Sequence, residues 1–183
     1  METAPPPLPL HAAEEHYEGQ PAVTWPAVLA GGVVMLALAL VLTALGAGFG
    51  WRLSSAWAIA PPEGFTTQVG VWLVVTQVIS GGLGGYIAGR LRTKWQNVHN
   101  HEVHFRDTAH GLIAWAVATI AGFVAAGMVL PGSPFLAASP DQADQFSMFL
   151  AFGLLLGAFI AMVAAALGGL RRDEMHAKFW KER

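Results

Sequence analysis

Apolar residues fill four long stretches without a charged side chain, at 19–51, 64–89, 108–140 and 145–170. Each stretch exceeds the roughly 20 residues that an α-helix needs to cross a bilayer core about 30 Å thick. The stretches are continuously apolar, whereas the strands of a membrane barrel alternate apolar and polar positions over about 10 residues. The pattern therefore predicts an all-α integral membrane protein, built as a four-transmembrane-helix bundle.

Breaks in the apolar pattern set the expected limits of these helices. We expect them at about 26–50, 69–89, 109–130 and 146–170, within a transmembrane domain that covers 26–170. Pro26 suits the first turn of the first helix, and Asp107 or Thr108 can cap the start of the third. The connection 51–68 contains prolines and glycine, and we expect it to lie on the membrane surface.

Two tails of different charge flank this domain. The tail 1–25 is rich in proline, lacks Lys and Arg and has no helical apolar period, so we expect it to be disordered. The tail 171–183 mixes basic with acidic residues and should continue the fourth helix out of the membrane. Phe179 and Trp180, among its basic residues, suit contact with anionic lipid headgroups.

Lys and Arg are divided unequally between the connections. Four lie in 90–106 and five in the C-terminal tail, against one in 51–68 and none in 131–145. Positively charged loops are retained in the cytoplasm. We therefore expect both termini, and the connection between the second and third helices, to be cytoplasmic.

The lengths of the uncharged stretches repeat along the chain, at 33, 26, 33 and 26 residues. The second stretch ends in Gly-Arg-Leu-Arg at 89–92, and the fourth ends in Gly-Leu-Arg-Arg at 169–172. A long and a short span, repeated once, predict two tandem helical hairpins of the same orientation.

Composition narrows the possible functions. The chain is 54% apolar and 12% charged, and no basic stripe is large enough to follow a phosphate backbone, so we expect no nucleic-acid partner. With no cysteine, the chain cannot form a disulfide, a thiolate nucleophile or a cysteine-ligated metal centre. No histidine lies deep enough in the expected helices to bind a haem, so we expect no cofactor.

Small residues recur every four positions on the expected helices. Such rows let helix backbones approach closely in lipid, where apolar surface alone gives helices little reason to associate. The rows contain Gly81, Gly85 and Gly89 on the second helix, Gly122 on the third, and Gly153, Gly157, Ala161, Ala165 and Gly169 on the fourth. Two roles remain open: the rows close the chain's own bundle, or one of them faces a second copy or another membrane protein.

Ionisable residues inside a membrane usually mark proton relays and ion paths. The four expected helices contain no Asp, Glu, Lys or Arg, so we do not expect a proton-coupled transporter. Gln77 is the one long polar side chain at depth in these helices. A hydrogen bond from Gln77 to a neighbouring helix is the simpler expectation than a solute site.

Four of the seven histidines lie between positions 99 and 110. On a helix His101, His104 and Asp107 would share one face, and together with His99 they form a candidate site for a divalent transition metal. The metalloprotease pattern of two histidines four positions apart is absent, and a solvated loop is the simpler explanation. His110 is expected beside Asp107, orienting the start of the third helix.

Three motifs carry a family resemblance: Trp-Pro-Ala-Val-Leu-Ala-Gly-Gly at 25–32, Gly-Gly-Leu-Gly-Gly-Tyr-Ile-Ala-Gly-Arg-Leu at 81–91 and His-Gly-Leu-Ile-Ala-Trp-Ala-Val at 110–117. Together they resemble a group of uncharacterised proteobacterial four-helix inner-membrane proteins, some labelled "PhnA-like". The resemblance implies a small multi-pass protein of the bacterial inner membrane and implies nothing about catalysis, since that group has no established activity. Soluble proteins of that label resemble zinc ribbons, which a chain without cysteine cannot form.

These features favour a non-enzymatic inner-membrane protein that packs as a homo-oligomer or serves as an accessory subunit of a larger membrane assembly. Its expected partners are the lipid bilayer and either itself or another membrane protein. One alternative is a small solute or ion pore, in which Gln77 and nearby hydroxyls line a path at the centre of an oligomer. Another is metal binding by the cytoplasmic histidine cluster.

Overall fold

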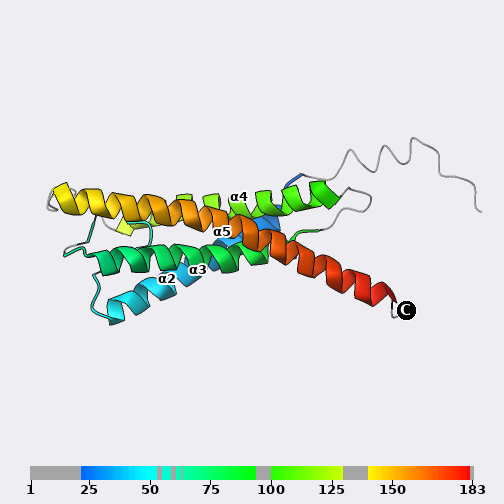
Figure 1. Cartoon of the computed structure of the whole chain (residues 1–183), viewed down its shortest axis with the longest axis horizontal. Helices are drawn as coiled ribbons and strands as arrows, with labels where there is room; N and C mark the ends of the chain where they lie inside the picture. Colours follow the sequence, from blue (N-terminus) through cyan, green and yellow to red (C-terminus); the bar gives the residue numbers. More distant parts are fainter. Residues whose placement is uncertain are drawn as a thin grey trace, which may run out of the picture.

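A computed structural model of the chain describes residues 22–52, 55–58, 61–62, 64–93, 100–129 and 140–181. These residues form the α-helices α2 (Trp25–Gly48), α3 (Thr67–Leu91), α4 (Asn100–Val129) and α5 (Pro140–Lys181). Each helix contains a window long and apolar enough to cross a membrane. Successive helices run in opposite directions, so the start of α2 and the end of α5 lie at the same end of the molecule (Figure 1). The predicted all-α four-helix bundle is confirmed.

The helix α3 is central to the bundle. It packs against α2, α4 and α5, and its longest contact is with α5. The helix α4 packs against both α2 and α5, whereas the backbones of α2 and α5 do not approach each other within the described helices. The two hairpins, α2 with α3 and α4 with α5, are therefore joined mainly along α3 and α5.

Small residues form the contact between α3 and α5. A Cβ atom on Gly81 would lie 2.8 Å from the carbonyl oxygen of Gly157, and one on Gly85 would overlap the backbone of Ala161. The two helix backbones touch here because neither glycine has a side chain. Close backbone contact of this kind replaces the hydrophobic driving force that helices lack in lipid.

The helix α2 ends in a glycine turn. Gly50 has a φ of 85°, its N–H donates to the carbonyl of Ala47, and the N–H of Trp51 donates to the carbonyl of Gly46. These two bonds define a Schellman motif, in which glycine takes the left-handed conformation at no steric cost. The turn directs the chain back toward the bundle.

Part of the connection after α2 lies inside the bundle. Residues 56–58, here called the re-entrant segment, are each at most 5% exposed. The ring of Trp57 lies against Gly122 of α4, and the side-chain amide of Gln77 donates to the carbonyl of Ala56 over 3.0 Å. Gln77 lies roughly 15 Å along the axis from the start of α3. The expected surface location of this connection is therefore wrong for residues 56–58, because Gln77 and Gly122 provide a site for them inside.

The outward side chains of the bundle are apolar. Large exposed examples include Val33 and Leu40 on α2, Ile120 and Met128 on α4, and Leu155 on α5. In water such a surface would be an aggregation hazard, whereas lipid tails solvate it well. The outside therefore suits a bilayer, and the inside is closed by glycine, alanine and a few polar groups.

The helix α4 begins earlier than the sequence analysis predicted, at Asn100. Asp107 and Thr108 consequently lie inside a helix and do not cap its start, which corrects that prediction. The hydroxyl of Thr108 instead donates to the carbonyl of Phe105 in the same helix, at 2.7 Å. Residues 100–108 contain neither Gly nor Pro, so their polarity alone does not end a helix.

The helix α5 also exceeds its predicted span, running from Pro140 to Lys181. Its final turns leave the side of the bundle, as the red end of the ribbon shows (Figure 1). The side chains of Phe179 and Trp180, for which lipid contact was predicted, lie outside the described residues, as does most of the tail 1–25.

Candidate functional site

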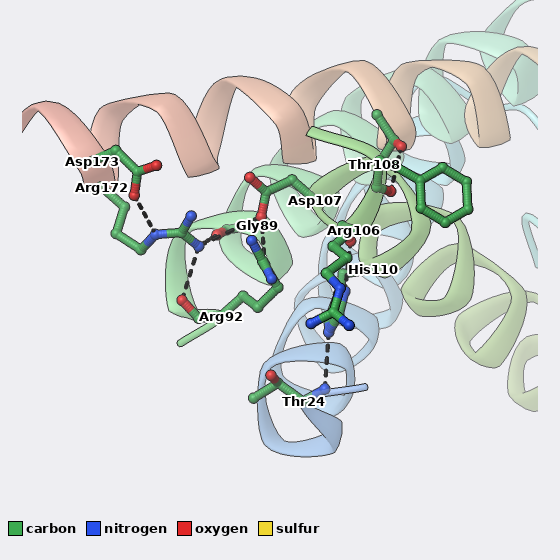
Figure 2. Close-up of polar contacts among 10 residues, drawn as sticks. Thr24, Gly89, Arg92, Arg106, Asp107, Thr108, His110, Arg172 and Asp173 are labelled. Atoms are coloured by element: carbon green, nitrogen blue, oxygen red, sulfur yellow. Dashed lines mark hydrogen bonds and ion pairs between the residues drawn. The ribbon is translucent and has the colours of Figure 1, made fainter. Parts of the chain in front are cut away.

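Charged side chains from three parts of the chain meet inside one end of the bundle (Figure 2). Arg92 directly follows α3, Asp107 belongs to α4 and Arg172 to α5. The Nε atom of Arg92 lies 2.6 Å from Oδ1 of Asp107, and Nη1 of Arg172 lies 3.5 Å from the same oxygen. All three side chains are buried, with exposed fractions between 1% and 8%. We call these residues the arginine–aspartate cluster.

Glycines make room for this cluster. A Cβ atom on Gly169 would overlap the carboxylate of Asp107, and one on Gly89 would overlap the backbone of Ala165. The absence of both side chains lets α5 approach α3 and α4 closely enough for the charges to meet. The repeated Gly-x-x-Arg pattern thus places an arginine one turn beyond each of these glycines, at Arg92 and Arg172.

Arg172 also closes the C-terminal end of α3. Its Nη1 donates to the carbonyl oxygens of Gly89, at 3.1 Å, and Arg92, at 2.9 Å. The last carbonyls of a helix have no partner within it, and a cation there also complements the helix dipole. One guanidinium therefore caps α3 and contacts the carboxylate on α4.

Each arginine of the cluster contacts a carboxylate. The Nε atom of Arg92 donates to Asp107, and the Nε atom of Arg172 donates to Asp173 over 3.0 Å. Removing one member of a buried ion pair strands its partner and typically costs about 3–5 kcal/mol. The geometry is that of an electrostatic clamp on α3, α4 and α5.

His110 links α4 to the start of α2. Its Nε2 accepts a hydrogen bond from the backbone N–H of Thr24 at 2.9 Å, and its Nδ1 lies 2.6 Å from the carbonyl oxygen of Arg106. An Nε2 that accepts carries no proton, so these partners select the neutral tautomer that donates through Nδ1. His110 was expected to act beside Asp107. In the structure Asp107 instead contacts Arg92 and Arg172, and His110 bonds the residue that precedes α2.

The predicted small-residue rows face elements of the same chain. In addition to the pairs described above, Gly153 approaches Val74 and Gly157 approaches Gln77. The placed residues are Gly81, Gly85 and Gly89 on α3, Gly122 on α4, and Gly153, Gly157, Ala161, Ala165 and Gly169 on α5. Of the two roles left open for these rows, closure of the bundle matches their position.

Gln77 bonds a non-helical segment, whereas a neighbouring helix was the expected partner. Gln77 is 2% exposed, and its side-chain amide nitrogen donates a hydrogen bond to the carbonyl oxygen of Ala56 in the re-entrant segment. Ser80, one turn later, returns its hydroxyl to the carbonyl of Thr76 at 2.6 Å. Gln77 and Ser80 therefore bond within the single chain, whereas the hydroxyls of Thr43, Thr76 and Thr119 have no hydrogen-bond partner among the described residues.

Of the candidate metal ligands, the side chains of His104 and Asp107 are described, and these two do not converge. Asp107 is buried in the arginine–aspartate cluster, whereas His104 is exposed on the same helix. His99 and the side chain of His101 lie outside the described residues. Among the residues that are described, no three His, Asp or Glu side chains are grouped so as to hold a metal ion.

The arginine–aspartate cluster is the feature that sequence reasoning missed. The signal was present in the repeated motif at 89–92 and 169–172, with a single aspartate before the third predicted span. Charges at helix ends were assigned to solvated loops, which is their usual location. Only the early start of α4 brings Asp107 to the level of both arginines.

No family model, curated protein or solved structure matches the chain. The function is therefore inferred from the geometry of the structure. The resemblance carried by the glycine-rich motifs stays an expectation.

Proposed function

We propose that this chain is a non-enzymatic multi-pass protein of the bacterial inner membrane that serves as a subunit of a larger membrane assembly. The supporting observation is the length of α5, which has 42 residues. That number corresponds to roughly 63 Å of helix, about twice the apolar thickness of a bilayer. The last turns of α5 thus leave both the bundle and the apolar layer.

The projecting part of α5, residues 174–181, is here called the docking arm. At its base Arg171 and Glu174 form an exposed ion pair of 3.3 Å, which adds only a few tenths of a kcal/mol to a helix. Met175 is 60% exposed, and its sulfur accepts a 3.5 Å hydrogen bond from Nη2 of Arg90 in the bundle. Short helices without tertiary packing are marginal in water, so a partner that packs along the docking arm would supply the missing stabilisation.

The small residues of α3 and α5 are in contact within one chain, as at Gly85 and Ala161, and are therefore not available to join two copies. The surfaces left for a partner are the apolar outside of the bundle and the docking arm.

The docking arm is proposed to lie in the cytoplasm, with both termini. Arg92 and Arg106 lie at the same end of the bundle as Arg172 (Figure 2), and Arg90 contacts Met175 of α5 there. Positive residues that flank membrane spans are retained on the cytoplasmic side. A cytoplasmic partner can reach the docking arm without entering the lipid.

Native mass spectrometry of the protein extracted in lipid nanodiscs tests the proposal. The full chain should appear in an assembly of constant stoichiometry and well above its own 19.4 kDa. A chain that ends at Asp173 should lose that assembly, whereas a control that lacks residues 1–21 should retain it. A full chain recovered only as a monomer, with no stoichiometric partner, would contradict the proposal.

A further inference from the structure

Three buried polar atoms without a hydrogen-bond partner belong to the re-entrant segment and to one face of α4: Nε1 of Trp57, Oγ1 of Thr119 and Nε1 of Trp115. Other such atoms of the described residues lie elsewhere, among them guanidinium nitrogens of Arg92 and Arg172. The ring of Trp57 lies against Gly122. Thr119 and Trp115 follow on successive turns of the same face of α4, each one turn closer to the arginine–aspartate cluster.

The helices α3 and α5 supply the opposite wall of this region. A Cβ atom on Gly157 would lie 3.4 Å from Nε1 of Trp115 and 3.3 Å from the backbone oxygen of Gln77. The indole nitrogen of Trp115 and the Gln77 backbone therefore flank one glycine. Gln77 also binds the re-entrant segment through its side chain, so segment and helices meet around the same place.

An indole N–H in a helix cannot donate to a carbonyl of its own helix one turn back, as a Ser or Thr hydroxyl can. A helical Ser or Thr often returns its hydroxyl to a carbonyl one turn back, as Ser80 does to Thr76. The indole group is a donor only and reaches no carbonyl of its own turn. An unpaired buried donor costs about 1–3 kcal/mol, so Trp57 and Trp115 each call for an acceptor.

The backbone of the re-entrant segment points to the same conclusion. Non-helical backbone at membrane depth occurs where it is buried in protein or lines a water-filled space. The segment is buried and carries the unpaired indole of Trp57, and the unpaired indole of Trp115 lies on α4 about two turns from Gly122, which Trp57 contacts. The side chains that carry the unpaired atoms, on Trp57, Trp115 and Thr119, are uncharged.

We propose that the re-entrant segment covers a hydrated site between α3, α4 and α5, which takes water and small uncharged molecules that accept hydrogen bonds. The site opens toward the end of the bundle opposite the arginine–aspartate cluster. At the cluster end the helices are closed by direct backbone contact, as at Gly89 and Ala165. This site is independent of the docking arm and of the proposed subunit role.

Thiol accessibility tests the proposal, because the chain has no cysteine of its own. Thr119→Cys changes little in size, and Ile120→Cys, next in sequence and 66% exposed on the outside of the bundle, is the matched control in lipid. A small methanethiosulfonate reacts with the thiolate, which forms in water and not in hydrocarbon. In liposomes, Thr119→Cys should react at least about tenfold faster than Ile120→Cys, from the side opposite the cluster. Equal, slow labelling of the two thiols would overturn the hydrated site.

Gln77→Leu tests the covering role of the segment. It retains the approximate size of the side chain and removes the donor that holds Ala56. Combined with Thr119→Cys, it should raise the labelling rate further, with an unchanged elution volume in size exclusion as the check on folding. An unchanged labelling rate in a correctly eluting protein would overturn the assignment of residues 56–58 as the cover.

Discussion

A single absent Cβ atom decides how closely α3 and α5 approach. At Gly85 a Cβ would overlap the backbone of Ala161, whereas at Gly82 it would lie 3.4 Å from a methyl group of Ile160. The first neighbour is backbone and cannot move alone, and the second is an ordinary van der Waals contact. Close packing of α3 on α5 therefore requires glycine at position 85, whereas position 82 has room for a Cβ atom.

Alanine substitution separates these two glycines. Gly85→Ala should lower thermal stability in detergent, because overpacking typically costs about 1–3 kcal/mol and exceeds the gain in helix propensity. Gly82→Ala should be neutral or raise the unfolding temperature, since Ala is favoured over Gly in helices by about 1 kcal/mol. Equal shifts of the unfolding temperature in the two variants would show that α3 and α5 do not depend on contact at Gly85.

Asp107 is the charged residue that joins α4 to both Arg92 and Arg172. Asp107→Asn keeps the shape of the side chain and removes the charge that Arg92 and Arg172 share. We expect a loss of about 3–5 kcal/mol in the free energy of unfolding, the usual cost of stranding a buried charge. Glu174→Gln breaks an exposed pair with Arg171 and should cost less than about 1 kcal/mol. Similar unfolding temperatures for the two variants would exclude a stabilising clamp.

At the scale of whole helices, the apolar stretches were sufficient to predict the four membrane-length helices of the described residues. Lipid offers no hydrogen bonds to a backbone, so a long apolar segment has to be helical. The residues at which the helices begin and end were predicted less well, because polar residues such as those at 100–108 are compatible with either a helix or a loop. Packing against α5, through the cluster at Asp107 and Arg172, favours the helix.

The candidate sites were predictable only in part. The small-residue rows are local patterns, and their close contacts follow from spacing. The re-entrant segment depends on Gln77 meeting Ala56 and on Gly122 leaving space for Trp57, which are contacts between residues distant in sequence. A single sequence contains no signal for such pairings.

His110 is predicted to hold the start of α2 in place. His110→Leu removes the acceptor of the Thr24 N–H, and the lost bond should cost about 1 kcal/mol. Hydrogen exchange should then accelerate at Thr24, while amides near Ala39, in the middle of α2, serve as the internal control. Unchanged exchange at Thr24 would show that the histidine does not stabilise this end of the helix.

At the scale of the molecule, one end of the bundle differs from the other. The arginine–aspartate cluster, the start of α2 and the docking arm share one end (Figures 1 and 2). Aromatic contacts mark the other end, where Phe65 and Phe146 stack edge to face at 5.4 Å. A bundle that spans the membrane with the cluster end in the cytoplasm places the docking arm where a cytoplasmic partner can bind it.

Side-specific labelling of two thiols on α5 tests that claim most directly. Met175→Cys and Asp141→Cys lie near opposite ends of this helix and are both at exposed positions. In intact cells, an impermeant maleimide should label Asp141→Cys and leave Met175→Cys unlabelled until the inner membrane is permeabilised. Labelling of Met175→Cys in intact cells, or equal labelling of both thiols, would contradict the four-span arrangement with a cytoplasmic docking arm.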